Sequence, residues 1–337
     1  MKAIVQNEYG SSAGFELKDI DKPVVKDDEV LVRVHAAALH AGDYFTMRGT
    51  PYLVRLTAGW PKPKNYIPGF DVAGHVEAVG QNVTRFQPGD SVFGECQATC
   101  AEYVCAQADK FVLKPAQLTF EQAAAVPVSA MTALRALRDV GQVQPGQQVL
   151  INGASGGVGT FAVQIAKSLG AAVTGVCSSR NGELVRSIGA DHVVDYTQED
   201  FTQSGRRYDL ILDNVGNRSF ADCGRALTPQ GRLLPNTGHA GLGYVVKAFI
   251  RSLFMRRQGR PFVSIPNNED LVVLKELIEA GKVTPVIDRT YPLRETSEAF
   301  RYLDKGHARG KVVITVSQNE PQGSREEYDV HIARNSF

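Results

Sequence analysis

The first 120 residues carry short apolar runs separated by glycine and proline. Three of these runs, at 29–39, 70–80 and 89–94, have the length of β-strands and are bounded by turn residues. Runs of this kind are typical of strands rather than helices. The pattern therefore predicts a β-rich unit at the start of the chain.

The hydrophobic period changes near Thr119, where apolar residues begin to recur at helical spacing. Thr119 and Gln122 form a T-x-x-Q pattern, which predicts a capping box at a helix N-terminus. From residue 147, strand-length runs alternate with helical stretches, including a short one after Tyr196. Repeated βα units predict a parallel, doubly wound sheet, so the expected fold class is α/β.

The last part of the chain departs from this simple repeat. A helical stretch near 269–283 precedes strand-like, helical and again strand-like segments that end at residue 316. We predict that these segments return to the first unit. Residues 317–337 are polar and rich in turn residues, which is typical of a surface tail.

Length, composition and charge narrow the class of protein. The 337 residues favour two domains, and 43% hydrophobic with 22% charged residues is typical of a globular, soluble protein. A formal net charge of +1 offers no reason to expect nucleic acid as a partner. The N-terminus shows no leader pattern, no long apolar window suggests a membrane span, and five cysteines suit a reducing compartment. We expect a cytoplasmic protein.

One short stretch, INGASGGVGT at 151–160, concentrates four glycines between a strand-like and a helical run. A strand followed by a glycine turn and a helix N-terminus is where unpaired N–H groups meet a pyrophosphate. The spacing departs from G-x-G-x-x-G, and such a turn can also serve helix packing alone. The βα units that follow favour a dinucleotide.

The tip of the second strand bears on the choice of dinucleotide. An NAD site usually has an acidic residue there, whereas this chain has Ser178, Ser179 and Arg180. A guanidinium can pair with a 2′-phosphate through charge-assisted hydrogen bonds. Alternatively, the serines cap the next helix. We expect NADPH.

In its sequence motifs, the chain resembles the medium-chain dehydrogenase/reductase superfamily, in its zinc-independent quinone oxidoreductase (zeta-crystallin-like) branch. The resemblance rests on ASGGVG (154–159), PGFDVAGHVEAVG (68–80), PGDSVFG (88–94) and ARGKVVITV (308–316). It implies a GroES-like substrate domain at 1–122 and 266–316, a Rossmann NADPH-binding domain at 123–265 and the polar tail at 317–337. It also implies a homodimer and reduction of quinones or of the C=C bond of α,β-unsaturated carbonyls.

The resemblance further implies roles for particular residues around the cofactor. Thr132 would approach the nicotinamide carboxamide and Val215 the cofactor's ribose region. Ser178, Arg180 and Tyr196 would surround the adenosine 2′-phosphate. The pyrophosphate would lie against Ser155, Gly156, Gly157, Val158 and Gly159.

Zinc-dependent relatives have metal ligands at two sequence positions of the first domain. Here His40 stands at the first position, but Phe70 stands where the second ligand would be. Because a catalytic zinc site needs at least three protein ligands, we predict no metal. Cys96, Cys100 and Cys105 fall one short of a four-cysteine site, so we expect them to be buried thiols.

Without a metal, the chemistry points to conjugated acceptors, which spread the developing charge over a longer π-system. Positioning and one or two hydrogen-bond donors then suffice. The candidate donors are His40, where the family usually has Asn, and Tyr52. His40 as a structural side chain is an open alternative, and Asp43 is expected to fix a turn.

A basic, amphipathic stretch at 243–262 has three possible roles: lid, dimer face or peripheral membrane contact. This stretch is consistent with a second function, that of an NADPH-binding structural or membrane-recruited adaptor with little turnover. A metal-independent alcohol dehydrogenase is a further alternative.

Overall fold

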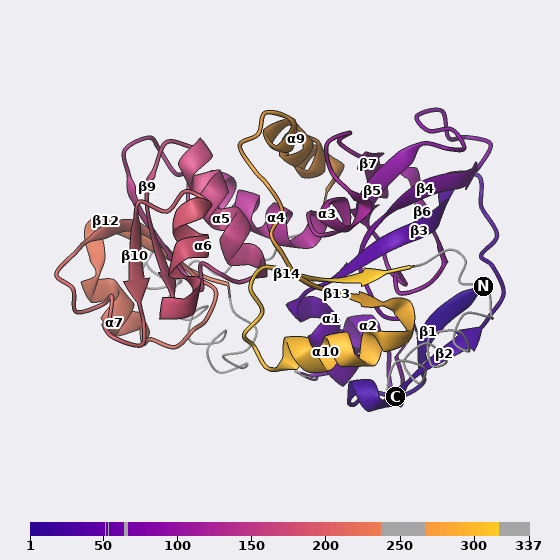
Figure 1. Ribbon diagram of the computed structural model, residues 1–337, viewed down its shortest axis with the longest axis horizontal. Helices are drawn as coiled ribbons and strands as arrows, with labels where there is room; N and C mark the ends of the chain where they lie inside the picture. Colours follow the sequence, from indigo (N-terminus) through magenta and orange to yellow (C-terminus); the bar gives the residue numbers. More distant parts are fainter. Residues whose placement is uncertain (51, 53, 64–66, 237–266, 317–337) are drawn as a thin grey trace, which may run out of the picture.

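The computed structural model describes residues 1–50, 52, 54–63, 67–236 and 267–316. These residues form two lobes, each built on one large sheet (Figure 1). The predicted segment 243–262 and the predicted tail at 317–337 lie outside the described residues. Among the helices that the structure describes, none combines the length and the apolarity needed to cross a bilayer.

The first lobe contains a seven-stranded sheet with the order β13-β14-β3-β4-β5-β7, in which β6 also pairs with β3. Its strands are β3 (Glu29–Leu39), β4 (Asp71–Val79), β5 (Ser91–Glu95), β6 (Tyr103–Gln107), β7 (Phe111–Leu113), β13 (Ile287–Pro292) and β14 (Lys311–Thr315). A separate antiparallel pair joins β1 (Lys2–Gln6) to β2 (Phe15–Asp19). The strands predicted at 29–39, 70–80 and 89–94 are confirmed.

β3 lies at the centre of this sheet and separates two hydrophobic cores. Its Val30, Val32 and Val34 are fully buried in the core of the first lobe. Ala36 and Ala38 instead belong to the core that continues into the second lobe. Because alanine adds little bulk, α3 (Phe120–Ala124) packs closely over β3 and β4.

The helical stretch that starts at Thr119 is helical but not continuous. The Thr119 hydroxyl accepts a hydrogen bond from Gln122 N, and the Gln122 side chain accepts one from Thr119 N, which confirms the capping box. α3 ends before Pro127, which begins α4 (Pro127–Leu134), and a π-helical turn follows at Arg135–Val140. Proline lacks an N–H and therefore starts a new helix rather than continuing α3.

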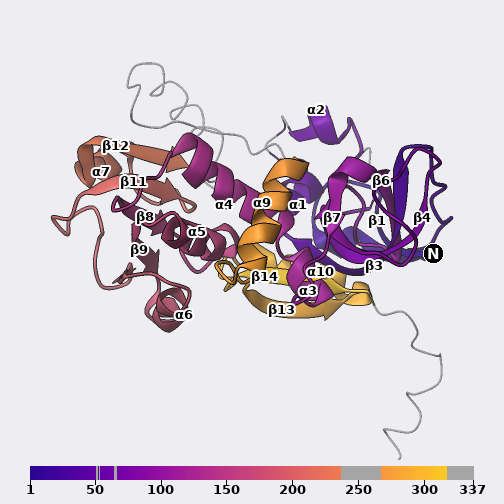
Figure 2. The ribbon, with the colours of Figure 1, turned by 90° about the horizontal axis from the view of Figure 1, so that it is seen from above.

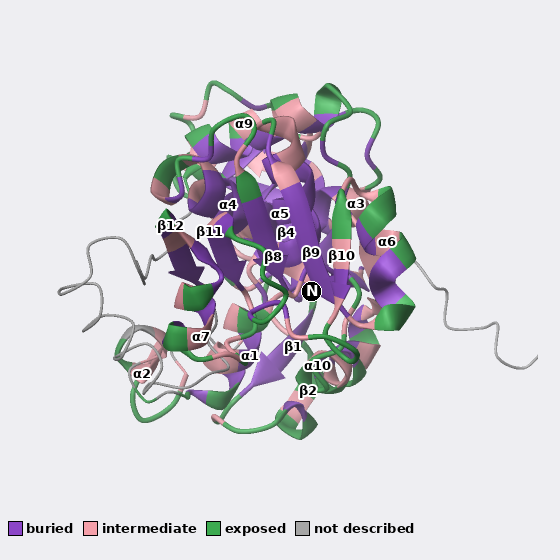
Figure 3. Ribbon diagram, turned by 90° about the vertical axis from the view of Figure 1, so that its left-hand side faces the viewer, coloured by how far each residue is buried: buried purple, intermediate pink, exposed green. Residues whose placement is uncertain are grey.

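The second lobe contains a five-stranded, wholly parallel sheet with the order β10-β9-β8-β11-β12, and most of its residues are buried (Figure 3). Its elements are β8 (Gln148–Asn152), α5 (Gly157–Ser168), β9 (Ala172–Cys177), α6 (Gly182–Ser187), β10 (His192–Asp195), β11 (Tyr208–Asp213), α7 (Phe220–Arg225) and β12 (Leu227–Pro235). The strand order runs outward in both directions from β8. The predicted doubly wound α/β sheet is confirmed.

One predicted helix in this lobe is wrong. The residues after Tyr196 form turns, because Asp195 Oδ1 accepts from Thr197 N and Asp200 Oδ1 accepts from Thr202 N. Such local side-chain bonds offer the backbone an alternative to helix.

The C-terminal elements return to the first lobe. β14 pairs antiparallel with β3, and β13 pairs parallel with β14. Figure 1 shows these yellow strands beside the indigo N-terminal strands, with α10 (Thr296–Asp304) below them. α9 (Asn268–Glu279) packs on α4 between the lobes (Figure 2). The predicted domain boundary at 265 lies outside the described residues and stays a prediction.

Candidate active site

The strand order reverses between β8 and β11, so the carboxyl ends of these strands form the crevice where open α/β sheets bind ligands. A buried polar network occupies this position. Asp213 is fully buried and accepts from Asn152 Nδ2 (2.8 Å), Val215 N (3.1 Å) and Gly216 N (2.9 Å). Sequence reasoning missed this network, although two polar residues that end buried strands are a usable signal. It fixes the loops that border the crevice.

The glycines between β8 and α5 divide into two kinds. A Cβ at Gly153 (φ +78°) would lie 2.9 Å from Val215 Cγ2, and one at Gly159 would lie 2.1 Å from Gly153 O. These two glycines are required for packing. At Gly156 and Gly157 a Cβ would make only ordinary van der Waals contacts, at 3.4 Å or farther, so internal packing does not require glycine there.

The N-terminus of α5 has the properties of a phosphate site. Gly156 is its N-cap residue, and no side chain caps it. The first N–H groups of a helix have no intrahelical partner, and they coincide with the positive end of the helix dipole. The Ser155–Gly159 segment therefore fits a pyrophosphate, both in donors and in space.

The tip of β9 is joined directly to this glycine loop. Asn181 Nδ2 donates to Ser155 Oγ at 3.0 Å, and Tyr196 N donates to Cys177 O at 3.1 Å. Ser178, Arg180 and Tyr196 are thereby gathered at the carboxyl ends of β9 and β10. Asn181 was missed from sequence, because nothing in its local pattern connects it with Ser155.

The side chains at this tip differ in their hydrogen bonds. Ser178 occupies an N-cap position but makes no side-chain capping bond, whereas Ser179 hydrogen-bonds Asp195. Those bonds and the ones from Thr197 lower the pKa of Asp195. Arg180 is exposed, and no hydrogen bond or ion pair engages its guanidinium within the described ranges. The structure therefore gives no support to capping by Ser178.

Thr132 and Val215 border the same crevice from two sides. Thr132 is 8% exposed on α4, and its hydroxyl donates to Val128 O at 2.7 Å. This bond leaves the oxygen of Thr132 as an acceptor. Val215 follows β11 with 41% exposure and contacts the glycine loop at Gly153. Their predicted roles toward a nicotinamide and a ribose stay predictions.

A buried ion pair lies under the start of α5 and joins three distant segments. Lys311 Nζ on β14 donates to Asp71 Oδ2 on β4 at 2.9 Å and to Ser129 Oγ on α4 at 3.1 Å. Asp71 Oδ1 also accepts from Val128 N at 2.9 Å. Beside it, Gly310 N donates to Ser155 O at 2.8 Å. The pair thus holds the two lobes together next to the glycine loop.

His40 is the N-cap residue of α1 (Ala41–Arg48), a position that also suits asparagine. Its Nδ1 accepts from Gly42 N at 2.9 Å, which assigns the ring proton to Nε2. Nε2 is buried, has no hydrogen-bond partner in the described part of the chain and lies 3.5 Å from Asp43 Oδ2. His40 is therefore structural through Nδ1, while its buried Nε2–H makes no hydrogen bond to the described residues.

Asp43 fixes this turn, as predicted, because its Oδ2 accepts from His40 N at 2.7 Å. Its carboxyl group is 1% exposed, and burial raises its pKa although the neighbouring His40 opposes that shift. Its second oxygen, Oδ1, has no hydrogen-bond partner among the described residues.

The residues at the two zinc-ligand positions, His40 and Phe70, do not provide the ligands of a catalytic zinc site. The Phe70 ring packs 5.5 Å from the His40 ring, centroid to centroid, and His40 Nδ1 is already engaged. Cys96 and Cys100 are buried free thiols whose pKa is raised by burial, and burial raises the pKa of Cys105 to about 12. Across the described residues, no three His, Cys, Asp or Glu side chains are grouped to hold a metal.

Tyr52 lies away from this pair. It is 68% exposed, and the Arg55 guanidinium stands 4.8 Å from the centre of its ring. The same guanidinium contacts the Tyr9 ring at 4.6 Å. No contact joins Tyr52 to His40 in the part of the chain that is described, so the structure does not bring these two candidates together.

Comparison with known proteins agrees with this architecture. Residues 26–133 match the family described as "Alcohol dehydrogenase GroES-like domain", and residues 188–314 match "Zinc-binding dehydrogenase". The mouse "NAD(P)H oxidoreductase RTN4IP1, mitochondrial" is 36% identical, over 94% of this chain and 89% of its own length. The Arabidopsis thaliana "NADPH-dependent alkenal/one oxidoreductase, chloroplastic" is 32% identical, over 93% and 79%.

Among solved structures, the quinone oxidoreductase from Coxiella burnetii superposes with a TM-score of 0.83 at 31% identity, covering 94% of this chain and 99% of its own. These likenesses span both lobes and the glycine loop between them. The chain belongs to the medium-chain dehydrogenase/reductase superfamily, in its quinone oxidoreductase-like branch, and is an NAD(P)H-dependent oxidoreductase.

Proposed function

We propose that this protein uses NADPH to reduce quinones or the C=C bond of α,β-unsaturated carbonyls, without zinc. The observation that carries the cofactor choice is the tip of β9. There, the side chains of Ser178 and Arg180 make no hydrogen bond or ion pair within the described residues, and Asn181 connects this tip to the glycine loop. Two relatives named for quinones and alkenals support the substrate class.

The nearest carboxylate at this tip does not serve as an NAD-type ribose ligand in our proposal. Asp195 lies at the end of β10, and its oxygens already receive bonds from Ser179 and Thr197. Arg180 then faces a 2′-phosphate with no competing ion pair in the described ranges. A bidentate guanidinium contact of this kind is strong and specific.

The bound nicotinamide would supply the hydride. The chain's own residues hold and orient the dinucleotide through Ser155–Gly159 and the loop after β11. His40 Nε2–H is the donor best placed to face the oxygen of a conjugated acceptor, because Nδ1 is held by Gly42 N. Asp43 restrains the imidazole from 3.5 Å away. Tyr52 stays a secondary candidate at the rim.

Zinc independence is part of the proposal, and it rests on Phe70 and on the protonated cysteines rather than on any empty site. A cation at a carbonyl oxygen supplies several kcal/mol of charge stabilisation. A conjugated acceptor needs less of it, because its charge is delocalised. Simple ketones are therefore expected to be poor substrates.

Steady-state kinetics on a panel of quinones and enones, with NADPH and NADH in parallel, test the proposal. We expect kcat/KM to favour NADPH, and Arg180→Ala to weaken NADPH binding about 10- to 100-fold, the equivalent of about 1.5–3 kcal/mol. Binding of NADH should barely change. Arg206→Ala is the matched control, since this exposed arginine precedes β11, at the amino ends of the strands and away from the tip of β9. Equal affinity of the parent protein for both cofactors contradicts the assignment.

A further inference from the structure

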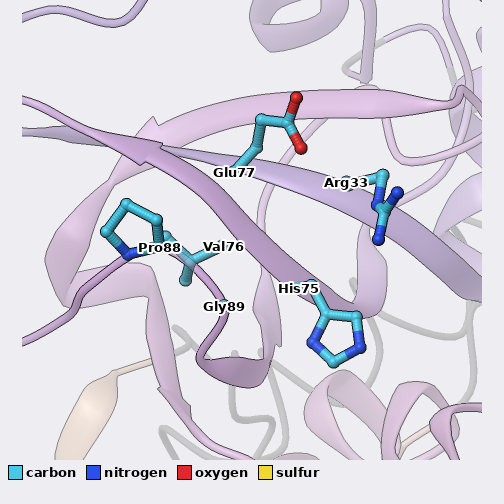
Figure 4. A pocket seen from close by; sticks show the side chains of 6 residues that line it. All are labelled: Arg33, His75, Val76, Glu77, Pro88 and Gly89. Atoms are coloured by element: carbon cyan, nitrogen blue, oxygen red, sulfur yellow. The ribbon is translucent and has the colours of Figure 1, made fainter.

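A second polar site lies on the sheet of the first lobe and shares no residue with the candidate active site. A pocket there is lined by Arg33, His75, Val76, Glu77, Pro88 and Gly89 (Figure 4). Arg33 on β3 and His75 on β4 are direct cross-strand partners. Figure 4 shows the Arg33 guanidinium directed toward the His75 ring, with Pro88 and Gly89 across the pocket.

The strands are irregular on both sides of this pair. The β3–β4 register shifts between Leu31 and Val32, which leaves Glu77 unpaired, and between Val34 and Ala36, which leaves His35 unpaired. Bulges of this kind re-aim side chains and are frequent next to functional sites. Here they gather His35, His75 and Arg33 into one cluster.

Two nitrogen atoms of this cluster lack a hydrogen-bond partner among the described residues. Arg33 Nε and His35 Nε2 are fully buried, and neither has a hydrogen bond in the described part of the chain. The His35 and His75 rings meet edge to face with centroids 4.9 Å apart, and His35 stacks on Phe120 at 4.4 Å. A buried donor without a partner is destabilising.

The surrounding charges do not neutralise Arg33. Glu77 is engaged by Lys22 Nζ at 2.8 Å, and Lys22 also covers the Tyr103 ring on β6. On α3, Glu121 acts on His35 but makes no ion pair with the cluster within the described residues. Lys114 stands over the Phe120 ring, and Ser91 Oγ lies 3.3 Å from His75 Nδ1. Arg33 acts on Glu77 electrostatically, but among the described residues no ion pair engages its guanidinium.

From this geometry we propose that the pocket binds a small oxyanion, the phosphate or carboxylate group of a metabolite, between Arg33 and His75, with the buried His35 ring beside His75. The planar fork of an arginine matches both groups bidentately. The imidazole N–H groups add further donors. The Gly89 side of the pocket is open, since a Cβ built there meets no atom within 4 Å.

The electrostatics of His35 agree with an anion site. Burial lowers the pKa of His35, and the nearby His75 and Arg33 lower it further. A bound oxyanion reverses the sign of the local field. We therefore expect anion binding to raise the pKa of His35 and to strengthen as the pH falls.

Histidine-selective NMR of the full chain tests the site, because the chain has only seven histidines. Inorganic phosphate and acetate are titrated separately at constant ionic strength, following the Cε1–H resonances of His35 and His75. We expect saturable shifts of both resonances. A stronger response to phosphate identifies a phosphate ligand, and a stronger response to acetate a carboxylate.

Arg33→Gln should weaken this binding by at least about 10-fold, as loss of a charged hydrogen bond implies. Lys26→Gln is the charge-matched control on the segment before β3 and should change the affinity less than twofold. If Arg33→Gln does not fold, Arg33→Lys keeps the charge without the fork and should still weaken binding. Absence of saturable shifts up to 50 mM anion (on the order of the weakest useful affinity), or unchanged binding in the Arg33 variants, overturns the proposal.

Discussion

The buried Lys311–Asp71 ion pair connects the sheet of the first lobe to α4 beside the glycine loop. Lys311 is 1% exposed and Asp71 is fully buried, so neither charge is solvated if the other is removed. In Lys311→Met, Asp71 would lose its 2.9 Å partner and keep only the hydrogen bond from Val128 N. Breaking a buried pair by removing one partner costs about 3–5 kcal/mol.

The same reasoning predicts that removing both charges is less harmful than removing either one. Asp71→Asn keeps a carbonyl acceptor for Val128 N, so the double variant Lys311→Met/Asp71→Asn should recover at least half of the single-variant loss. Lys167→Met is the matched control, because Lys167 pairs with Asp191 at 2.8 Å but both side chains are more than a third exposed. Such exposed pairs contribute about 0–1 kcal/mol.

Urea denaturation of the parent protein, the two single variants, the double variant and the control, followed by circular dichroism, measures these differences as shifts in midpoint and in unfolding free energy. Nucleotide binding measured alongside should weaken in Lys311→Met, since the pair lies under Gly157 at the start of α5. Two results refute the reasoning. One is a loss below about 1 kcal/mol for Lys311→Met. The other is a double variant whose loss of unfolding free energy equals the sum of the losses in the two single variants.

The remaining predictions concern pH, capping and the glycine loop. Burial and the neighbouring Asp71 raise the pKa of Glu95 from 4.5 to about 7, so the folded protein binds this proton more tightly than the unfolded chain does. The free energy of unfolding therefore falls by up to about 3 kcal/mol as the pH rises from about 4.5 to 7. Glu95→Gln should remove that loss, which unfolding at pH 5 and pH 8 checks. Thr119→Ala should lower the unfolding free energy by about 1 kcal/mol while Thr119→Ser should not, and equal losses would contradict the capping box. Gly153→Ala should abolish dinucleotide binding in a titration, because its new Cβ would lie 2.9 Å from the Val215 side chain. Gly146 has the same left-handed backbone but space for a Cβ, so the control variant Gly146→Ala should still bind.

The elements that sequence predicted well are those set by local pattern. The run at 29–39 is buried along most of its length, and the T-x-x-Q pair at Thr119 needs only neighbours three residues apart. The glycine loop was also predictable, because its conformation follows from its own residues and the strand before it. Where local side-chain bonds competed with helix, as at Asp195 and Thr197, the prediction was wrong.

The parts that sequence could not predict depend on contacts between distant segments. Lys311 and Asp71 are 240 residues apart, and Asn181 reaches Ser155 across 26 residues. Neither contact has a local signature. The position of His75 opposite Arg33 and beside His35 depends on the β3–β4 register, which only the paired strands reveal. His40 was identified from the family pattern, but its N-cap bond, and hence its tautomer, required the backbone of Gly42.

Transfer of deuterium from NADPH labelled at C4 tests the central claim most directly. The labelled cofactor is mixed with an enone or with a simple ketone, in each case with and without a strong chelator, and the products are analysed by mass spectrometry and NMR. The account predicts deuterium at the β-carbon of the enone, at a rate that the chelator does not change, and little transfer to the ketone. Transfer that is confined to simple ketones, or that disappears on chelation and returns with zinc, contradicts it.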